Sequence, residues 1–166
     1  GAPGAWLVAQ RTPADVLAQI VTRIGVVTTE SPDSGFVASS YRFTLDKEPE
    51  SAVDGTFLVD MPEGSKQAPT YGVTETIWNA LVNIDVAYFR GGGDLHAADR
   101  QTVNRDAATD MQRLGDVVAN PDGYNGTSSG IRNIVFQGFR RIGDARAMEI
   151  WRASYTVQWQ SDLVTA

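Results

Sequence analysis

The sequence predicts an α+β domain in which two main helices pack on a mostly antiparallel sheet of four to five strands, in the order α-β-β-β-α-β-β. Two segments repeat apolar residues at three-to-four spacing, which is typical of helices with one buried face. Other segments alternate apolar and polar residues with a period of two, as half-buried strands do. A tight turn at Gly143 and Asp144 joins the last two strands and indicates an antiparallel hairpin, which places the chain in the α+β class.

The chain has 166 residues, of which 42% are hydrophobic, and this is enough for a single domain with a buried core. We expect the core over residues 12–160, an N-terminal arm over residues 1–11 and a short tail over residues 161–166. No apolar run approaches the roughly 20 residues that span a bilayer, so we expect no membrane segment. The start also lacks the features of a signal peptide, and we therefore expect a cytoplasmic product.

Composition argues against several kinds of chemistry. The chain has no Cys, which removes disulfides, thiolate metal sites and a cysteine nucleophile. Its net charge is -6. A protein that clamps nucleic acid needs clustered Lys and Arg to replace counterions, so this charge argues against such a function.

Residues 1–11 combine small residues and Pro with the apolar run Trp6-Leu7-Val8. This composition predicts an arm that precedes the first helix. Two interpretations stay open: Trp6 pins the arm against its own domain, or the arm docks on a neighbouring subunit.

A helix is predicted over residues 13–24. Thr12 is a good N-cap, Pro13 suits the first helical position, and Asp15 adds negative charge to the first turn. Gly25 is expected to end the helix in the left-handed conformation. The apolar stripe, which we expect to cover the sheet, consists of Val16, Leu17, Ile20, Val21 and Ile24.

Two strands and two loops are predicted next. Residues 37–45 alternate as a half-buried strand, and residues 46–55 form a polar loop. Phe57, Val59 and Met61 mark a second strand, which we expect to stop at Pro62. Residues 62–71 then predict an exposed loop.

The longest strand-like stretch covers residues 73–89, although two shorter strands interrupted near Asn79 fit nearly as well. Asn83 and Asp85 are expected to face outward and leave one face of the sheet wet. The apolar face consists of Trp78, Ala80, Val82, Ile84, Val86 and Tyr88.

A second helix is predicted from Asp94 to Ala119, where Asp94 is the cap. Asp110 and Arg113 are expected to pair on its surface. Its buried stripe consists of Val103, Ala107, Met111, Leu114 and Val118. A loop over residues 122–130 and two strands, over residues 131–142 and 147–160, complete the domain.

No enzyme signature is found. The three glycines at residues 91–93 predict a turn, because no phosphate-loop motif follows them. His96 is flanked by Asp94 and Asp99, a set that conceivably holds a metal or acts as a general base. First-turn acids at a helix N-terminus explain the two carboxylates more simply. We therefore expect no catalytic residue, cofactor or metal.

The order of elements resembles the tail terminator (tail completion) proteins of long-tailed bacteriophages and the related head–tail joining proteins. The resemblance covers roughly residues 12–160. It rests on the opening helix, the helix beginning at Asp94, and three strand sequences: YRFTL at residues 41–45, IDVAYF at residues 84–89 and YTVQW at residues 155–159.

This resemblance implies a structural virion protein that carries no catalytic residues. It implies a homohexameric ring at the head–tail junction, which caps the tail tube, stops its polymerisation and joins it to the head connector protein. The ring is assembled in the host cytoplasm, and DNA passes through its lumen without specific binding. The alternatives are another connector or neck protein, a small non-viral ligand-binding or enzyme domain using His96, Asp94 and Asp99, and a binding module that forms no ring.

The arm, the two predicted loops and the turn of the last hairpin are the expected contact regions, because we expect them to be exposed. The residues assigned to these assembly contacts are Trp6, Leu7, Glu63, Lys66, Tyr71, Tyr124, Asn125, Arg140, Arg141 and Arg146.

Overall fold

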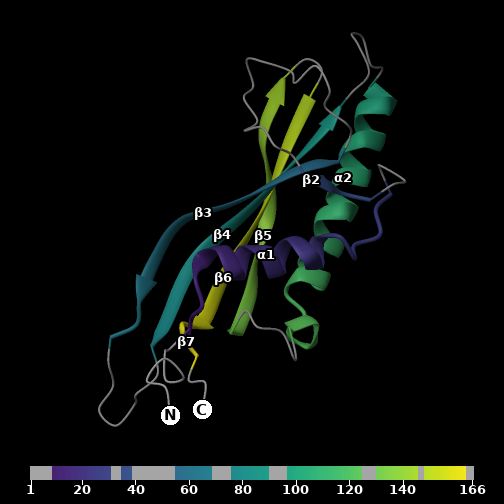
Figure 1. Ribbon diagram of the computed structural model, residues 1–166. Helices are drawn as coiled ribbons and strands as arrows, with labels where there is room; N and C mark the ends of the chain where they lie inside the picture. Colours follow the sequence, from purple (N-terminus) through teal and green to yellow (C-terminus); the bar gives the residue numbers. More distant parts are fainter. Residues whose placement is uncertain are drawn as a thin grey trace, which may run out of the picture.

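The computed structural model of the chain describes residues 9–30, 35–38, 55–68, 76–89, 97–124, 130–145 and 148–163. Two helices, α1 (Pro13–Ile24) and α2 (Ala97–Val118), lie on one face of a five-stranded sheet (Figure 1). The predicted α+β class and element order are confirmed. Within these described ranges, no helix is both long and apolar enough to cross a membrane.

The main sheet has the strand order β2-β3-β4-β6-β5, and only the short β2–β3 pair is parallel. A second sheet pairs two short strands near the chain ends, β1 (Ala9–Gln10) and β7 (Asp162–Leu163). The strands of the main sheet are β2 (Val37–Ala38), β3 (Thr56–Lys66), β4 (Ile77–Phe89), β5 (Ile131–Ala145) and β6 (Met148–Gln160).

Helix α1 begins as the sequence predicts. The Thr12 backbone N–H donates to Asp15 Oδ2 at 2.7 Å, and the Thr12 hydroxyl donates to the same oxygen at 3.0 Å. These two bonds stabilise the ionised carboxylate and lower the pKa of Asp15. The predicted left-handed ending is wrong, because Gly25 is right-handed with φ −63° and its N–H bonds Val21 O.

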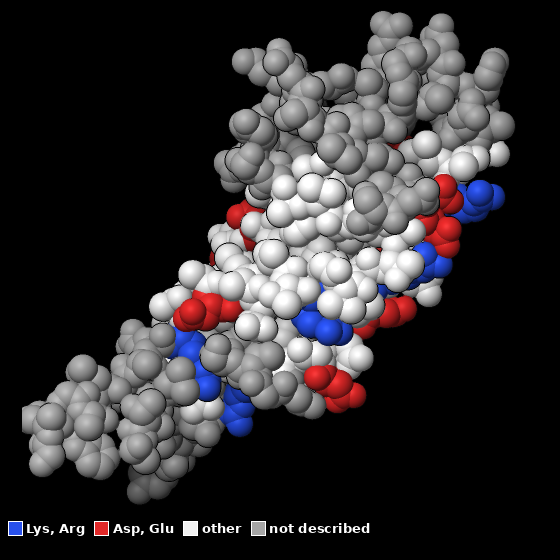
Figure 2. Space-filling view, turned by 45° about the vertical axis from the view of Figure 1, so that its right-hand side comes forward, with Lys and Arg blue, Asp and Glu red and all other residues white. Residues whose placement is uncertain are grey.

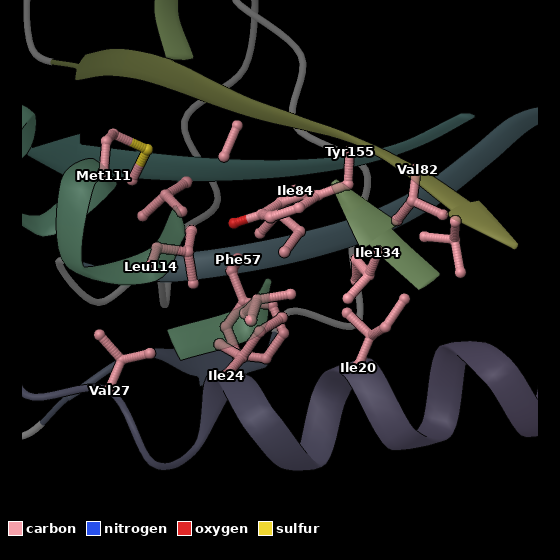
Figure 3. Close-up of a cluster of buried hydrophobic side chains, with 14 of the residues drawn as sticks. Ile20, Ile24, Val27, Phe57, Val82, Ile84, Met111, Leu114, Ile134 and Tyr155 are labelled. Carbon is pink, nitrogen blue, oxygen red and sulfur yellow. The ribbon is translucent and has the colours of Figure 1, made fainter. Parts of the chain in front are cut away.

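The hydrophobic core lies between the two helices and the sheet (Figure 3). Ile20 and Ile24 of α1 point up towards the sheet, while Met111 and Leu114 of α2 approach the same space from the side. Strand β6 contributes Tyr155, whose ring crosses the centre of the cluster. The even-numbered face of β4, from Ala80 to Tyr88, is buried as predicted. The helical stripes therefore meet the apolar face of the sheet.

The prediction that Asp110 and Arg113 pair on the surface of the second helix is wrong. The Asp110 carboxylate is fully buried, where it accepts hydrogen bonds from Tyr88 Oη at 3.0 Å and from the Glu30 backbone N–H at 2.7 Å. Arg113 instead pairs with the Glu30 side chain at 2.6 Å. These two contacts attach the segment that follows α1 to helix α2.

Strand β3 continues through Pro62, where we had expected it to stop. The register shifts between Asp60 and Glu63, so that Met61 and Pro62 form a bulge, and pairing then resumes as far as Lys66. A bulge is one of the few places where a strand accommodates a residue without an N–H. The predicted exposed loop is therefore wrong for residues 62–66, although their side chains are exposed.

The last hairpin is longer than predicted. The predicted turn at Gly143 and Asp144 is wrong, because these residues pair with Ile150 and Glu149 and the ladder continues to Ala145 and Met148. Strand β5 also contains three register shifts, and its bulge residues are Arg132, Gln137 and Ile142.

The face of the sheet opposite the helices carries a row of polar contacts between β4 and β6. Arg152 bonds both carboxylate oxygens of Asp85, at 2.7 and 3.0 Å, and this raises the pKa of Arg152. Ser154 donates to Asn83 Oδ1 at 2.9 Å. Asn83 is nevertheless buried, so this face is polar but not fully wet. Further along it, Ala87, Met148 and Ile150 form a small buried cluster.

Candidate functional site

The first candidate surface is the outer edge of β5. Strand β5 ends the sheet, and no other strand of the described residues pairs with its outer side. With 15 residues it is the longest strand in the described part of the chain, where all its ladder bonds go to β6. An open edge of this length presents unpaired backbone groups to another strand.

Exposed apolar side chains gather on this strand. Val135, Phe139 and Ile142 are exposed by 44%, 41% and 36% respectively. Phe139 lies tilted against Trp151 with the ring centroids 6.0 Å apart, so its outer side remains available for contact. Apolar side chains beside an open backbone edge favour a protein partner over solvent.

The two edges of the sheet differ in charge. The exposed side chains of β5 include Arg132, Arg140 and Arg141, and Arg141 also pairs with Glu149 at 3.0 Å. Beyond its first two residues, β3 at the opposite edge has no outer partner among the described residues, and it carries Asp60, Glu63 and Lys66. Elsewhere, acidic and basic groups alternate on the face seen in Figure 2, and neither sign forms a continuous patch there.

The second candidate surface is a groove of about 510 Å³, which we call the tryptophan groove. It lies where β3, β4 and β6 extend past the start of α1 (Figure 1). Residues 11–13 line one side, Met61 and Lys66 of β3 line another, and Trp78 and Trp159 belong to the strands beneath.

Trp78 and Trp159 are directly opposite each other in the β4–β6 register. Their rings stack with centroids 6.3 Å apart and planes 17° apart. Trp159 is 2% exposed, and its buried Nε1 has no hydrogen-bond partner among the groups that the structure describes. Trp78 and Met61 are only half-buried. The groove thus presents aromatic and apolar surface that is only partly covered.

The structure brings together only some of the predicted assembly residues. Glu63 and Lys66 are exposed on β3, and both line the tryptophan groove. Arg140 and Arg141 are exposed on β5, at the other edge of the sheet, rather than in a turn. The predicted contact residues that lie outside the described part of the chain are Trp6, Leu7, Tyr71, Asn125 and Arg146.

Tyr124 lies inside the molecule rather than in an exposed loop. It ends a short 3-10 helix, η2 (Pro121–Tyr124), and its hydroxyl donates to Val118 O at 2.7 Å. Burial raises the pKa of Tyr124 to about 12. Its side chain therefore anchors the end of α2 and offers little surface to a partner.

The residues of the enzyme alternative are not placed. Asp94 and His96 lie outside the described residues, and Asp99 lies in α2 but its side chain is not described. Among the residues that are described, no group of three or more His, Asp or Glu is arranged to hold a metal ion.

No protein-family profile matches this sequence, and no curated protein has significant similarity to it. The site is therefore interpreted from its own geometry: an α+β domain with an open, basic sheet edge and a separate aromatic groove.

Sequence reasoning missed the tryptophan groove. Trp78 is predicted on the apolar face of its strand, but nothing local links it to Trp159, which is 81 positions away in the chain. The available signal was that each one occurs at the end of an alternating segment, where helix cover runs out. This signal is useful only when the β4–β6 register is known, and local periodicity does not determine that register.

Proposed function

We propose that this chain is a ring-forming structural protein of the bacteriophage head–tail junction, a tail terminator that caps the tail tube and joins it to the head connector. The open edge of β5 is the observation that carries the proposal, because it supplies both backbone groups and apolar side chains for a second copy. The order of elements, which resembles that of the terminator family, supplies the biological setting.

Strand directions favour contact between copies of the same orientation. The four long strands β3, β4, β6 and β5 alternate in direction across the sheet. A second copy placed the same way up therefore brings its β3 beside β5 as an antiparallel neighbour, and the alternation continues. The bulges of β5 interrupt this pairing. A partner strand whose register matches the bulges is therefore favoured, and unrestricted edge-to-edge association is disfavoured.

Charge favours the same arrangement. Two β5 edges placed together bring the arginines of one copy towards those of the other, whereas β5 against β3 brings them towards Asp60 and Glu63. A contact between two different edges is heterologous, and a heterologous contact closes into a ring when its rotation permits. A ring of net-negative subunits also suits a lumen through which DNA slides without sticking.

The first test is particle mass and shape over a wide concentration range, by light scattering and negative-stain imaging. Closed rings of about six subunits are expected from the resemblance and from the heterologous contact. A monomer at every concentration, including after addition of tail tubes, contradicts the proposal. Addition of the rings to polymerising tube protein then separates a terminator, which stops growth, from another neck protein, which does not.

A matched pair of variants tests the contact itself. Val135→Asp places a charge on the β5 edge, and Val26→Asp places the same charge on a valine that follows α1 and is 59% exposed. The β5 variant should raise the protein concentration needed for assembly about tenfold or more, equivalent to about 1.4 kcal/mol. The Val26 variant should leave it unchanged. Equal effects would place the contact elsewhere on the molecule.

A further inference from the structure

We propose that the tryptophan groove of one copy receives the apolar N-terminal arm of a second copy, with Trp6 seated against Trp78 and Met61. This inference rests on the proposed self-assembly of the chain and names a second contact in it, separate from the β5 edge.

The chemistry of the groove suits an uncharged apolar segment. Its floor is aromatic, and Trp78 and Met61 are only half-buried, so a further apolar side chain removes more of their surface from water. Residues 1–8 contain no charged side chain and end in Trp6-Leu7-Val8.

Residues 39–54 contain the apolar side chains Tyr41, Phe43 and Leu45, but they are attached at the wrong end of the sheet. They join Ala38 to Gly55, whose N–H bonds Ala87 O. Ala87 and Trp78 are nine positions apart on β4, a distance of about 30 Å along the strand. A segment that starts and ends at one place can extend outward by only about half its length, which is about 26 Å for these residues. It therefore does not reach the groove of its own copy.

The direction of the chain indicates that the arm enters the groove of a second copy rather than the groove of its own copy. The chain passes from the arm through β1, which pairs with β7, and reaches the groove only at Arg11. If Leu7 and Val8 formed a tight turn, Trp6 would lie opposite Ala9, which is short of the groove. If the arm continues in the extended direction of β1, Trp6 lies about 10 Å beyond Ala9 and away from its own groove.

Cysteine labelling tests this inference cleanly, because the chain has no Cys of its own. Met61→Cys places a single thiol in the groove, and Gln112→Cys places one on the exposed face of α2 as a matched control. In assembled protein, the thiol at position 61 should react with maleimide about tenfold more slowly than in the same variant lacking residues 1–8. The control thiol should react equally in both. Protection at position 61 that survives the deletion means that another segment fills the groove, and it overturns the proposal.

A mixing experiment then decides which copy supplies the arm. Trp6→Cys and Met61→Cys are prepared as separate proteins of distinguishable size and are assembled together under mild oxidation. A mixed disulfide between the two proteins is expected, because only an arm that crosses between copies produces it. A single chain that carries both substitutions is the comparison. If that chain forms a disulfide within itself while no mixed disulfide forms, the proposal is overturned. Trp6→Cys mixed with Gln112→Cys should form no mixed disulfide.

These outcomes are independent of the proposed function. Assembly is measured by light scattering in the same samples. If rings form and the thiol at position 61 is insensitive to the arm, only the groove assignment fails. If no assembly forms under any condition, the ring proposal fails first.

Discussion

The two faces of the sheet are built differently, although the same strands supply both. On the helix side, buried apolar residues from α1, α2 and the strands form one continuous cluster. On the opposite side, β4 and β6 are joined by the polar contacts of Asp85 with Arg152 and of Asn83 with Ser154. The helix side supplies burial, which is non-directional, and the opposite side supplies contacts that require one register.

This difference separates stability from specificity. A fully buried apolar side chain is held by many neighbours, so its loss leaves a cavity. A partly buried polar pair contributes less to stability, but it forms only when β4 and β6 are aligned as observed. We therefore expect substitutions on the two faces to differ in size and in their response to salt and pH.

The largest effect is expected from Leu114→Ala on the helix side. Leu114 is fully buried, so the cavity should lower the free energy of unfolding by about 2–5 kcal/mol. Leu81→Ala makes the same change on the opposite face of β4, where the side chain is only half-buried, and should cost about 1 kcal/mol. Urea unfolding at a fixed protein concentration measures both. Equal losses would remove the proposed difference between the faces.

A smaller effect is expected where Gly115 of α2 packs against Phe136 of β5. A Cβ on Gly115 would stand 2.6 Å from the ring of Phe136. Gly115→Ala should therefore destabilise the fold by about 1–3 kcal/mol, despite the better helix propensity of Ala.

A double variant distinguishes this steric cause from others. Phe136→Leu removes the ring, so it should recover part of the loss in the Gly115→Ala background. If the two losses simply add, the close approach of helix and strand is not the cause.

On the polar face, Asp85→Asn should cost about 1–2 kcal/mol, because it weakens the two charge-assisted bonds from Arg152. Glu30→Gln weakens the more exposed pair with Arg113 and should cost about 0.5 kcal/mol or less. Thermal unfolding at low and high salt measures both losses. The Asp85 effect should persist at high salt, and its disappearance would mean that solvent screens this pair as it does a surface pair.

The smallest effect at neutral pH comes from the buried tyrosines. Burial raises the pKa of Tyr124 from 10.0 to about 12 and also raises the pKa of Tyr155. Since the folded values lie above the unfolded value, this stabilisation is fully present below pH 10 and is lost as the pH rises through the folded pKa. The free energy of unfolding should therefore fall from about pH 10 upward, and Tyr124→Phe should reduce that fall. Phenolate absorbance during an alkaline titration checks that Tyr124 ionises late.

The helices and most of the strands were predictable because their patterns are local. The repeat of Val16, Ile20 and Ile24 and the cap at Thr12 determine α1 without knowledge of the rest of the chain. The exact reversal of the last hairpin was not predictable, because each bulge in β5 shifts the alternation by one residue.

Contacts that depend on register or on distant segments were also missed. Asp110 was interpreted as a surface residue because its partners, Tyr88 and the Glu30 backbone, lie 22 and 80 positions away. The tryptophan groove depends on the alignment of β4 with β6 in the same way. Of the candidate site, the sequence predicted that Arg140 and Arg141 are exposed, but not that they lie at a sheet edge.

The three bulges of β5 also determine where the chain tolerates changes in length. The 15 residues of β5 lie opposite a shorter stretch of β6, and Arg132, Gln137 and Ile142 are the extra ones. Deleting one of these residues converts a bulge into regular pairing and leaves Phe136 and Phe139 facing the helices. Deleting a residue from the middle of β6 instead turns every later side chain to the other face. Divergence in length within this hairpin should therefore accumulate in β5, while β6 keeps its spacing.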